Sequence, residues 1–391
     1  MATNAMNIEQ INTVLANIIN QATGSTALAT YRGDALVTVA QTALLNSPDT
    51  VYQAINQLML KTIFSVRKYV RHLKSMRVDT QRYGNAVRKI NYIDITPDAN
   101  ASYEIQDGQS TDMYINHFLK VVQTNMYGQV AYEYPLTTPL VQLNTAVRSA
   151  EEFGAFWTSM LTHVNNNIEQ AHETLSRALI VNGIASVIDE NNGSRVVKLL
   201  TDYNTETGLE LTAQDIYKPE NFPAFMAWAA ARIARIRRMM TERSQIFHTN
   251  ITGKAVSRFT DYRDQRMYLY APLQFDLNMR ALSELFNDKY LKLGDNELVS
   301  FWQSIESPEK INQTPVYMDT NGAVKTAAKA VEKSTVFGVI QDVDFSGMTV
   351  VNERQRTTPL NARGEYFNTF YKFNDRYWMD NSENCVVLLL D

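Results

Sequence analysis

The strongest hint of metal chemistry in this sequence is one Glu-x-x-His pair, Glu169 and His172. Residues three positions apart on a helix share a face, and such a pair is half of the ligand set of a di-iron bundle site. The other half needs a second pair of this kind, and no other histidine here has a glutamate three residues before it. Cys385, the only cysteine, has no companion at zinc-site spacing. We therefore interpret Glu169 and His172 as part of a polar helix face, and we expect no bound metal and no cofactor.

The common motifs of nucleotide-binding and hydrolytic enzymes do not occur in the sequence. It contains no G-x-x-x-x-G-K-[ST] phosphate loop, no G-x-G-x-x-G dinucleotide motif and no G-x-S-x-G nucleophile turn. We expect no catalytic residues and a protein that is not an enzyme. A metal-dependent enzyme is the weakest of the alternatives.

Arginines cluster in one predicted helix, over residues 221–243. Several basic side chains on one helix face are what nucleic-acid binding requires, and four of these arginines roughly satisfy that geometry. We favour a solvated face, or ion-pair partners for a neighbouring subunit, over nucleic acid. The candidate anion-facing residues are Arg232, Arg235, Arg238 and Arg243.

The composition is that of an ordinary globular protein. The chain has 391 residues, of which 45% are hydrophobic and 20% charged, and this length allows two or three domains. The net charge of -4 is slight for this length, so no strong long-range field draws nucleic acid or acidic lipid to the protein. The first 31 residues contain no Lys or Arg, so we expect no signal peptide and a protein that works in the cytoplasm of the cell that makes it. No apolar run approaches the roughly 18 residues of a membrane span.

Residues 66–148 indicate a long excursion from the body, built on a β-hairpin. Short Tyr-rich stretches with alternating polarity are separated by turn residues, and the charges are segregated by sign. An isolated two-stranded ribbon is marginally stable, so this hairpin needs a surface to lie on, either its own body or another subunit. The candidate contacts with another subunit are Arg67, Arg71, Lys74, Arg77, Arg82 and Arg88 in the basic part, and Asp94, Asp98, Glu104, Asp107 and Asp112 in the acidic part.

Residues 149–182 predict an unusually long helix. Ser149 and Glu152 form a capping box, apolar residues then recur every three or four positions, and Asn182 and Gly183 are expected to end the run. Three helical patterns precede it, at 7–21, at 34–45 and after Asp49. Beyond it we expect a hairpin of strands 186–189 and 195–200 joined through Asn192-Gly193, and helices at 221–243, 278–290 and 323–333.

The C-terminal part predicts four strands, at 336–341, 348–356, 365–379 and 385–390. The chain finishes on its most hydrophobic segment, CVVLLL. A free chain end is normally frayed and polar, so this segment should be fixed inside a sheet formed by earlier residues. Cys385 is then expected to be a small buried hydrophobic residue.

The order of these elements resembles the major capsid proteins of tailed bacteriophages, which have the Hong Kong ninety-seven type of shell fold. The chain is most similar to the capsid proteins of small short-tailed phages. The local likeness lies in residues 357–389, TTPLNARGEYFNTFYKFNDRYWMDNSENCVVLL, with an Asn/Arg-Gly turn, a long aromatic strand and a closing apolar strand. The resemblance implies an α+β fold with an N-terminal helical arm, an extended β-hairpin loop, a long spine helix, and peripheral and axial domains.

The resemblance also implies a division of the chain. Residues 1–65 would be the N-terminal helical arm and 66–148 the extended loop. Residues 149–214 would form the peripheral domain with the spine helix 149–182. Residues 215–335 would form the axial domain, and the strands of 336–391 would return through both domains.

The implied function is a major capsid protein whose hexamers and pentamers close into an icosahedral shell around packaged double-stranded DNA, in a virion assembled in the host cytoplasm. Implied partners are further copies, a separate scaffolding protein and a portal protein, with only weak non-specific DNA contact and no membrane. Some relatives form Lys-to-Asn crosslinks, but nothing marks Lys89, Lys120 and Asn384 as reactive. The alternatives are an encapsulin-like shell that holds enzyme cargo and a nucleic-acid-binding protein that uses the arginine helix.

Overall fold

The structure is a computed structural model that describes residues 69, 72–73, 75–77, 87–103, 105–108, 110, 113–127, 129–139, 150–190, 193–272 and 297–391. The helices predicted within 1–65 and at 278–290 lie outside these residues. No helix in the described part of the chain is long and apolar enough to cross a membrane.

A five-stranded sheet forms the centre of the body. Its order is β4 (Val196–Lys198), β14 (Cys385–Leu389), β11 (Val336–Asp342), β5 (Gln265–Tyr270) and β6 (Glu297–Val299). Strand β14 pairs antiparallel with β11 and parallel with β4. Every residue of β11 and β14 is buried, because both faces of the strands are covered. This burial explains the continuous apolar sequence of β14 and of β11 as far as Ile340. The prediction that the last apolar segment is fixed inside a sheet is confirmed.

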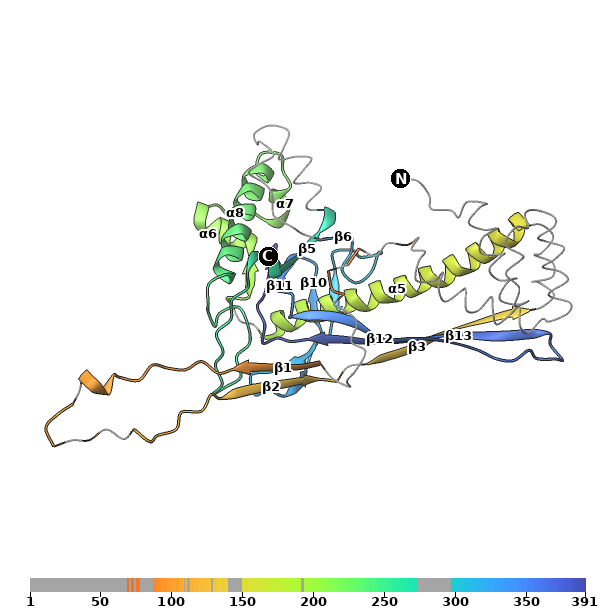
Figure 1. The fold of residues 1–391 in the computed structure, drawn as a ribbon. Helices are drawn as coiled ribbons and strands as arrows, with labels where there is room; N and C mark the ends of the chain where they lie inside the picture. The colour runs from red at the N-terminus through yellow and green to blue at the C-terminus, as the bar shows by residue number, and fades with distance from the viewer. Residues whose placement is uncertain are drawn as a thin grey trace.

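Three helices follow β4 and pack beside this sheet: α6 (Leu199–Thr207), α7 (Ala213–Ile216) and α8 (Phe222–Met240) (Figure 1). Pro223 stands in the first turn of α8, where its missing N–H costs nothing. Helix α8 buries an apolar stripe at helical spacing that includes Phe225, Ala229, Ile233 and Ile236. The helix predicted at 221–243 is therefore confirmed, although it ends three residues earlier.

The second sheet is three-stranded and antiparallel, in the order β12 (Ser346–Thr357), β13 (Tyr366–Met379) and β3 (Val130–Pro139). The long helix α5 (Ala150–Glu190) runs beside it (Figure 1). In β13, Phe367, Thr369, Tyr371 and Phe373 are buried and alternate with more exposed residues, as expected for a sheet with one covered face. The C-terminal strands predicted from the sequence are thus confirmed.

A third layer is the two-stranded ribbon of β1 (Val87–Tyr92) and β2 (Val121–Met126), which pair antiparallel. The chain between them extends far from the body and carries one short 3-10 helix, η2 (Ala101–Tyr103) (Figure 1). An antiparallel hairpin within the predicted range 66–148 is confirmed, but it spans only residues 87–126, because 130–139 form β3 of the second sheet. The remaining short elements are β7 (Ile311–Gln313) with β10 (Val331–Lys333), β8 (Val316–Met318) with β9 (Val324–Thr326), and η3 (Tyr262–Asp264).

The predicted end of the long helix is wrong, because α5 continues through Gly183 to Glu190. A Cβ atom at Gly183 would lie 2.9 Å from Cε1 of Phe345, so this glycine allows a close helix contact and does not end the helix. Ile184 and Val187 are fully buried beyond it. The strand predicted at 186–189 is therefore also wrong, and of the expected hairpin only β4 exists. Burial of the last turns outweighs the local signal of the Asn-Gly pair.

The helix predicted at 323–333 is also wrong, because this segment forms β9 and β10. Gly322 has a φ of 76°, and the Asp319 carboxylate accepts hydrogen bonds from the backbone N–H groups of Asn321 and Ala323. This turn directs β9 back onto β8, while β10 pairs with β7. Strand partners remote in sequence thus override the helix propensity of the alanines.

Candidate functional site

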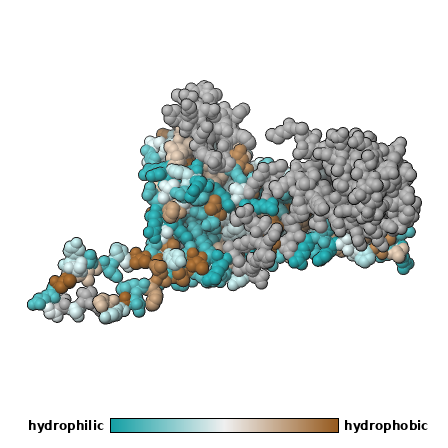
Figure 2. Space-filling model, viewed as in Figure 1, coloured by the Kyte–Doolittle hydropathy of each residue, from teal (hydrophilic) through white to brown (hydrophobic). Residues whose placement is uncertain are grey.

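The most unusual surface of the molecule is the segment between the two strands of the ribbon, residues 93–120, which we call the arm. It projects from the body and carries apolar side chains along its length (Figure 2). Tyr103 is 89% exposed and Phe118 is 83% exposed, so these rings gain almost nothing from the subunit itself. Other large exposed apolar residues of the arm are Ile95, Ile105, Met113, Tyr114, Ile115 and Leu119.

The register of the ribbon explains why its outer face is also apolar at the end nearest the arm. Successive side chains of a strand point to opposite faces. Lys89 and Asn91 face the body, whereas Ile90 and Tyr92 point away from it and are largely exposed, as is Val121, the partner of Tyr92. Contiguous apolar patches of this kind mark interaction surfaces on soluble proteins. The arm and the outer ribbon face together are therefore the strongest candidate functional site.

The basic candidates at the start of the hairpin are only partly described. Arg77 forms an isolated parallel bridge with Met348, and the Met348 N–H donates to the Met76 carbonyl oxygen at 2.8 Å. Arg88 is exposed on the outer face of β1. The other basic candidates, Arg67, Arg71, Lys74 and Arg82, lie outside the described residues.

The acidic candidates separate into two groups. Asp98 and Asp107 are exposed on the arm. Asp94 lies at its root, where its carboxylate accepts hydrogen bonds from the Ser257 N–H at 2.8 Å and the Ser257 hydroxyl at 2.5 Å, and pairs with Arg243 at 2.5 Å. The hydrogen bonds from Ser257, with a smaller contribution from Arg243, hold the pKa of Asp94 below its usual range. Glu104 and Asp112 lie outside the described residues.

The candidate anion-facing arginines are mostly paired within the chain. Arg232 binds Asp202 at 2.9 Å, Arg238 lies 3.5 Å from Glu242, and Arg243 binds Asp94. Arg235 is exposed. These intrachain carboxylates neutralise much of the positive charge that a phosphate backbone would contact.

The histidine of the Glu-x-x-His pair is part of a buried hydrogen-bonded cluster. His172 is buried, and its Nε2 lies 2.9 Å from Oδ2 of Asp375. The Tyr132 hydroxyl donates to the same oxygen at 2.5 Å, and burial raises the pKa of that tyrosine. This cluster joins α5 to β13 and β3. Within the described ranges, no group of three or more His, Cys, Asp or Glu side chains could hold a metal ion.

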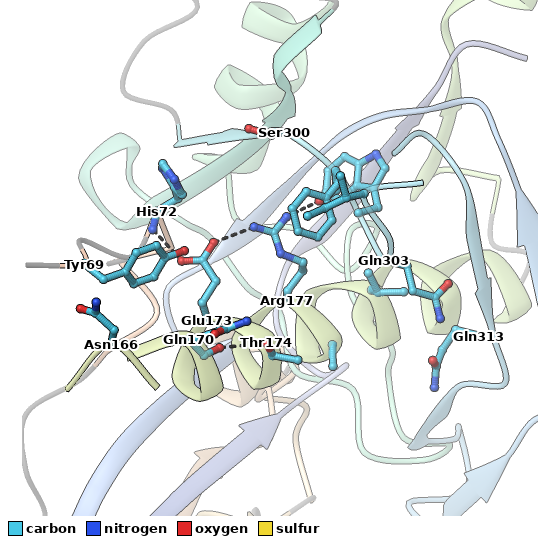
Figure 3. A pocket seen from close by; sticks show the side chains of 15 residues that line it. Tyr69, His72, Asn166, Gln170, Glu173, Thr174, Arg177, Ser300, Gln303 and Gln313 are labelled. Carbon is cyan, nitrogen blue, oxygen red and sulfur yellow. Dashed lines mark hydrogen bonds and ion pairs between the residues drawn. The ribbon is translucent and has the colours of Figure 1, made fainter. Parts of the chain in front are cut away.

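One cavity of about 630 Å³ lies between α5 and the loop after β6 (Figure 3). Its charged side chains bind each other: Arg177 pairs with Glu173 at 2.6 Å and stacks 3.8 Å over the ring of Phe301. Glu173 also accepts a hydrogen bond from the His72 N–H at 2.7 Å. Arg177 and Glu173, the two oppositely charged side chains of the cavity, are thus engaged with each other and with these neighbours.

Sequence reasoning missed two features. The first is the set of large apolar residues of the arm, which were not singled out. The second is a cluster of charges at the root of the arm, in which Lys89 and Arg258 meet Asp380 and Glu383. These residues come from three distant parts of the chain, and nothing in the sequence brings them together.

Comparison with known proteins gives one family. A family model described as Phi29-like phage major capsid protein matches residues 11–389. A chain of the capsid structure of Staphylococcus phage Andhra is 10% identical with a TM-score of 0.54, and the match covers 83% of this chain and 86% of that chain.

A chain from a structure of native bacteriophage P68, described as showing its head fiber and inner core protein, is 9% identical with a TM-score of 0.55, over 83% of this chain and 88% of that chain. At these identities the likeness is one of fold, and it confirms the predicted α+β capsid fold. No curated protein sequence matches this chain.

Proposed function

Since this chain belongs to the family of Phi29-like phage major capsid proteins, we propose that it assembles as hexamers and pentamers into an icosahedral shell around the packaged double-stranded DNA of a tailed phage. It is a structural protein of the virion, and copies of it build the capsid. Such a role requires no catalytic group, and we propose that the protein is not an enzyme. A separate scaffolding protein and a portal protein are its further proposed partners, and assembly takes place in the host cytoplasm.

The arm is the observation that supports contact between copies. Burial of apolar surface is worth about 25 cal/mol per Å², and the arm offers its large side chains to solvent instead of to its own body. Another copy can cover them, so that the arm becomes ordered and protected only in the assembly. Many interfaces of modest strength then add up to a closed shell.

The charges favour one orientation of this contact. Asp98 and Asp107 make the arm acidic, whereas one row across the second sheet places Arg354 beside Lys372 on its exposed face. Lys372 pairs with Glu133 at 3.5 Å in the same row, so Arg354 gives the row its net positive charge. We place the acidic part of the arm against such a basic surface of a neighbouring copy, and the basic part of the hairpin, with Arg77 and Arg88, against acidic surface of another. Complementary charge of this kind orients partners more than it strengthens binding.

The proposed division of the subunit follows the family resemblance. Residues 66–148 form the extended loop, 149–214 the peripheral domain with α5, and 215–335 the axial domain, with the strands of 336–391 returning through both. The N-terminal helical arm is 1–65. The ion pairs of Arg232 in α8 and of Arg243 just after it, together with the net charge of -4, support only weak, non-specific contact with packaged DNA.

Electron microscopy of the purified protein, alone and with a candidate scaffolding protein, tests this function. Closed shells or sheets of hexamers are the expected result. A protein that stays monomeric under all conditions of salt, concentration and scaffold would contradict it.

A further inference from the structure

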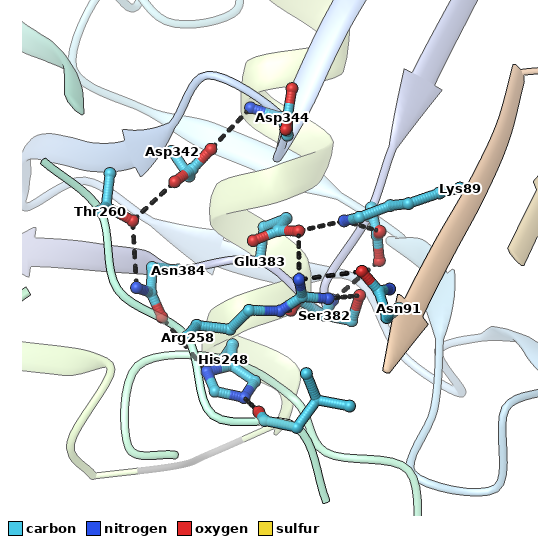
Figure 4. Close-up of polar contacts among 12 residues, drawn as sticks. Lys89, Asn91, His248, Arg258, Thr260, Asp342, Asp344, Ser382, Glu383 and Asn384 are labelled. Atoms are coloured by element: carbon cyan, nitrogen blue, oxygen red, sulfur yellow. Dashed lines mark hydrogen bonds and ion pairs between the residues drawn. The ribbon is translucent and has the colours of Figure 1, made fainter. Parts of the chain in front are cut away.

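The root of the arm contains a buried cluster of four charges (Figure 4). The Lys89 ammonium, on the inner face of β1, lies 2.6 Å from Oδ2 of Asp380 and also forms an ion pair with Glu383. The side chains of Asp380 and Glu383 are 0% and 7% exposed, and that of Lys89 is 17% exposed. These carboxylates therefore have little access to water and depend on protein partners.

Arg258 completes the cluster and connects to the same strand. Its guanidinium lies 3.0 Å from Glu383, donates to Oδ1 of Asn91 at 3.0 Å and donates to the Ser382 carbonyl oxygen at 3.0 Å. Lys89 and Asn91 are two positions apart and point to the same side of β1. Two successive inward-facing residues of the ribbon are thus bound to the body.

The carboxylates lie in a turn that is itself firmly held. The turn of residues 380–384 joins β13 to β14, and the Asp380 N–H donates to the Phe345 carbonyl oxygen at 2.7 Å. The Thr249 N–H donates to the Asn381 carbonyl oxygen at 2.8 Å, and Asp380 accepts from the Ser382 N–H at 2.9 Å. Because β13 belongs to the three-stranded sheet and β14 to the five-stranded sheet, contacts with this turn fix the ribbon to both sheets.

A further contact lies where the arm leaves the ribbon. The Asp94 N–H donates to the Ala255 carbonyl oxygen at 3.2 Å, and its carboxylate binds Ser257 and Arg243. From residue 89 to residue 94 an extended chain spans about 17 Å. A single contact with the body would let the ribbon rotate about that point, whereas contacts at residues 89, 91 and 94 fix the direction in which the arm leaves the body.

We propose that Lys89 and Arg258 are positioning residues for assembly, which set the direction in which the arm leaves the free subunit before it meets another copy. The inference rests on the proposed function, in which the arm contacts a neighbour. A swing of the ribbon away from the body would remove Lys89 from Asp380, which would stay buried without a cation, and would leave Glu383 with Arg258 alone. An unpaired buried charge is strongly unfavourable. The free subunit therefore prefers one direction of the arm over many others. An arm that already has this direction loses less conformational entropy when it binds another copy.

The test is a distance measurement between spin labels in the unassembled subunit. One label is placed at Ser102 on the arm and the other at Thr205 on α6, both exposed positions. Cys385 is buried and does not interfere. The test variant is Lys89→Met/Asn91→Ala/Asp380→Asn, which cuts the links from β1 and leaves the Arg258 and Glu383 pair intact. We expect one narrow distance distribution in the unchanged protein and a distribution at least twice as broad in the variant.

Arg88→Met is the matched control, because Arg88 lies on the same strand with its side chain on the exposed outer face. It should leave the distribution narrow, and Lys89→Arg, which keeps the charge, should do the same. An unchanged narrow distribution in the triple variant would overturn the proposal. If that variant does not fold, the single variant Asn91→Ala takes its place in the test, because it leaves all four charges paired. Hydrogen exchange of the β1 and β2 amides is measured in the same variant. Exchange at least tenfold faster than in the unchanged protein supports the proposal, and unchanged exchange overturns it.

The shell assembly of the same variants separates this inference from the proposed function. We expect the triple variant to form fewer and less uniform shells than the unchanged protein and Arg88→Met. Because the spin-label distance is measured in the free subunit, a failure of the unchanged protein to form shells would count against the proposed function alone.

Discussion

Cys385 shows how strongly the environment of one residue can change its chemistry. It is the first residue of β14 and is completely buried. This burial raises the pKa of its thiol to about 12 from an ordinary value of 9.0. The thiolate is the reactive form, so the native protein should not react with a thiol reagent at pH 8, and one thiol should react after denaturation. A rapid reaction of the folded protein would show that β14 opens or that the thiol is accessible.

The same shift sets a pH dependence of stability. A pKa that is higher in the folded than in the unfolded state gives a stabilising contribution that is complete below about pH 9 and is lost as the pH rises towards 12. Denaturant titrations between pH 8 and pH 11 should therefore show a fall in the free energy of unfolding. The fall should be smaller in Cys385→Ala, which has no thiol. Equal slopes for the two proteins would contradict the assignment to this residue.

Gly338 lies where two strands approach most closely. A Cβ atom there would lie 2.7 Å from the carbonyl oxygen of Tyr268 and 2.6 Å from Cδ2 of Leu269. Backbone atoms cannot move aside easily, so Gly338→Ala should destabilise the subunit by about 1–3 kcal/mol. Gly193→Ala is the control, because nothing lies within 4 Å of the added atom. Urea denaturation of both variants measures this difference, and equal midpoints would contradict the predicted cost of a Cβ atom at Gly338.

At the scale of elements, β14 is the strand on which the central sheet depends. It lies between β11 and β4, so its removal would leave β4 without its partner and open the core. Deletion of residues 385–391 should abolish folding. The milder change Leu388→Ala removes a fully buried side chain and should cost about 2–5 kcal/mol. Leu209→Ala, at a position 45% exposed, should change the free energy of unfolding by about 0.5 kcal/mol or less. A stable truncated subunit would contradict this role of β14.

The sequence predicted β11 to β14 almost to the residue, because alternation and continuous apolar runs are direct records of which faces are buried. It failed at Gly183 and at 323–333, where a contact with Phe345 and pairing with β7 and β8 decide the conformation. The candidate site divides in the same way. The hairpin follows from local turn signals, whereas the cluster around Lys89 depends on three chain segments that only the fold brings together.

At the scale of the whole molecule, the body and the arm have opposite energetic characters. The body buries its apolar residues in one large core that includes β11, β14 and the inner face of α8. The arm buries very little and keeps its large apolar side chains exposed. Stability therefore belongs to the body, and the capacity for association belongs to the arm. The two properties should therefore be separable by experiment.

Replacement of residues 95–118 by an Asn-Gly turn should make that separation visible. The turn can join the two ribbon strands where the Ile93 N–H already donates to the Lys120 carbonyl oxygen at 2.9 Å. Because the removed side chains contribute little to the subunit, its melting temperature should change by only a few degrees, while shell formation should be lost. The smaller change Tyr114→Ser/Phe118→Ser should weaken assembly, and Val324→Ser, at an 81% exposed position on the body, should not. Light scattering and electron microscopy measure assembly, and normal shells from the armless subunit would exclude the arm as the contact that joins the copies.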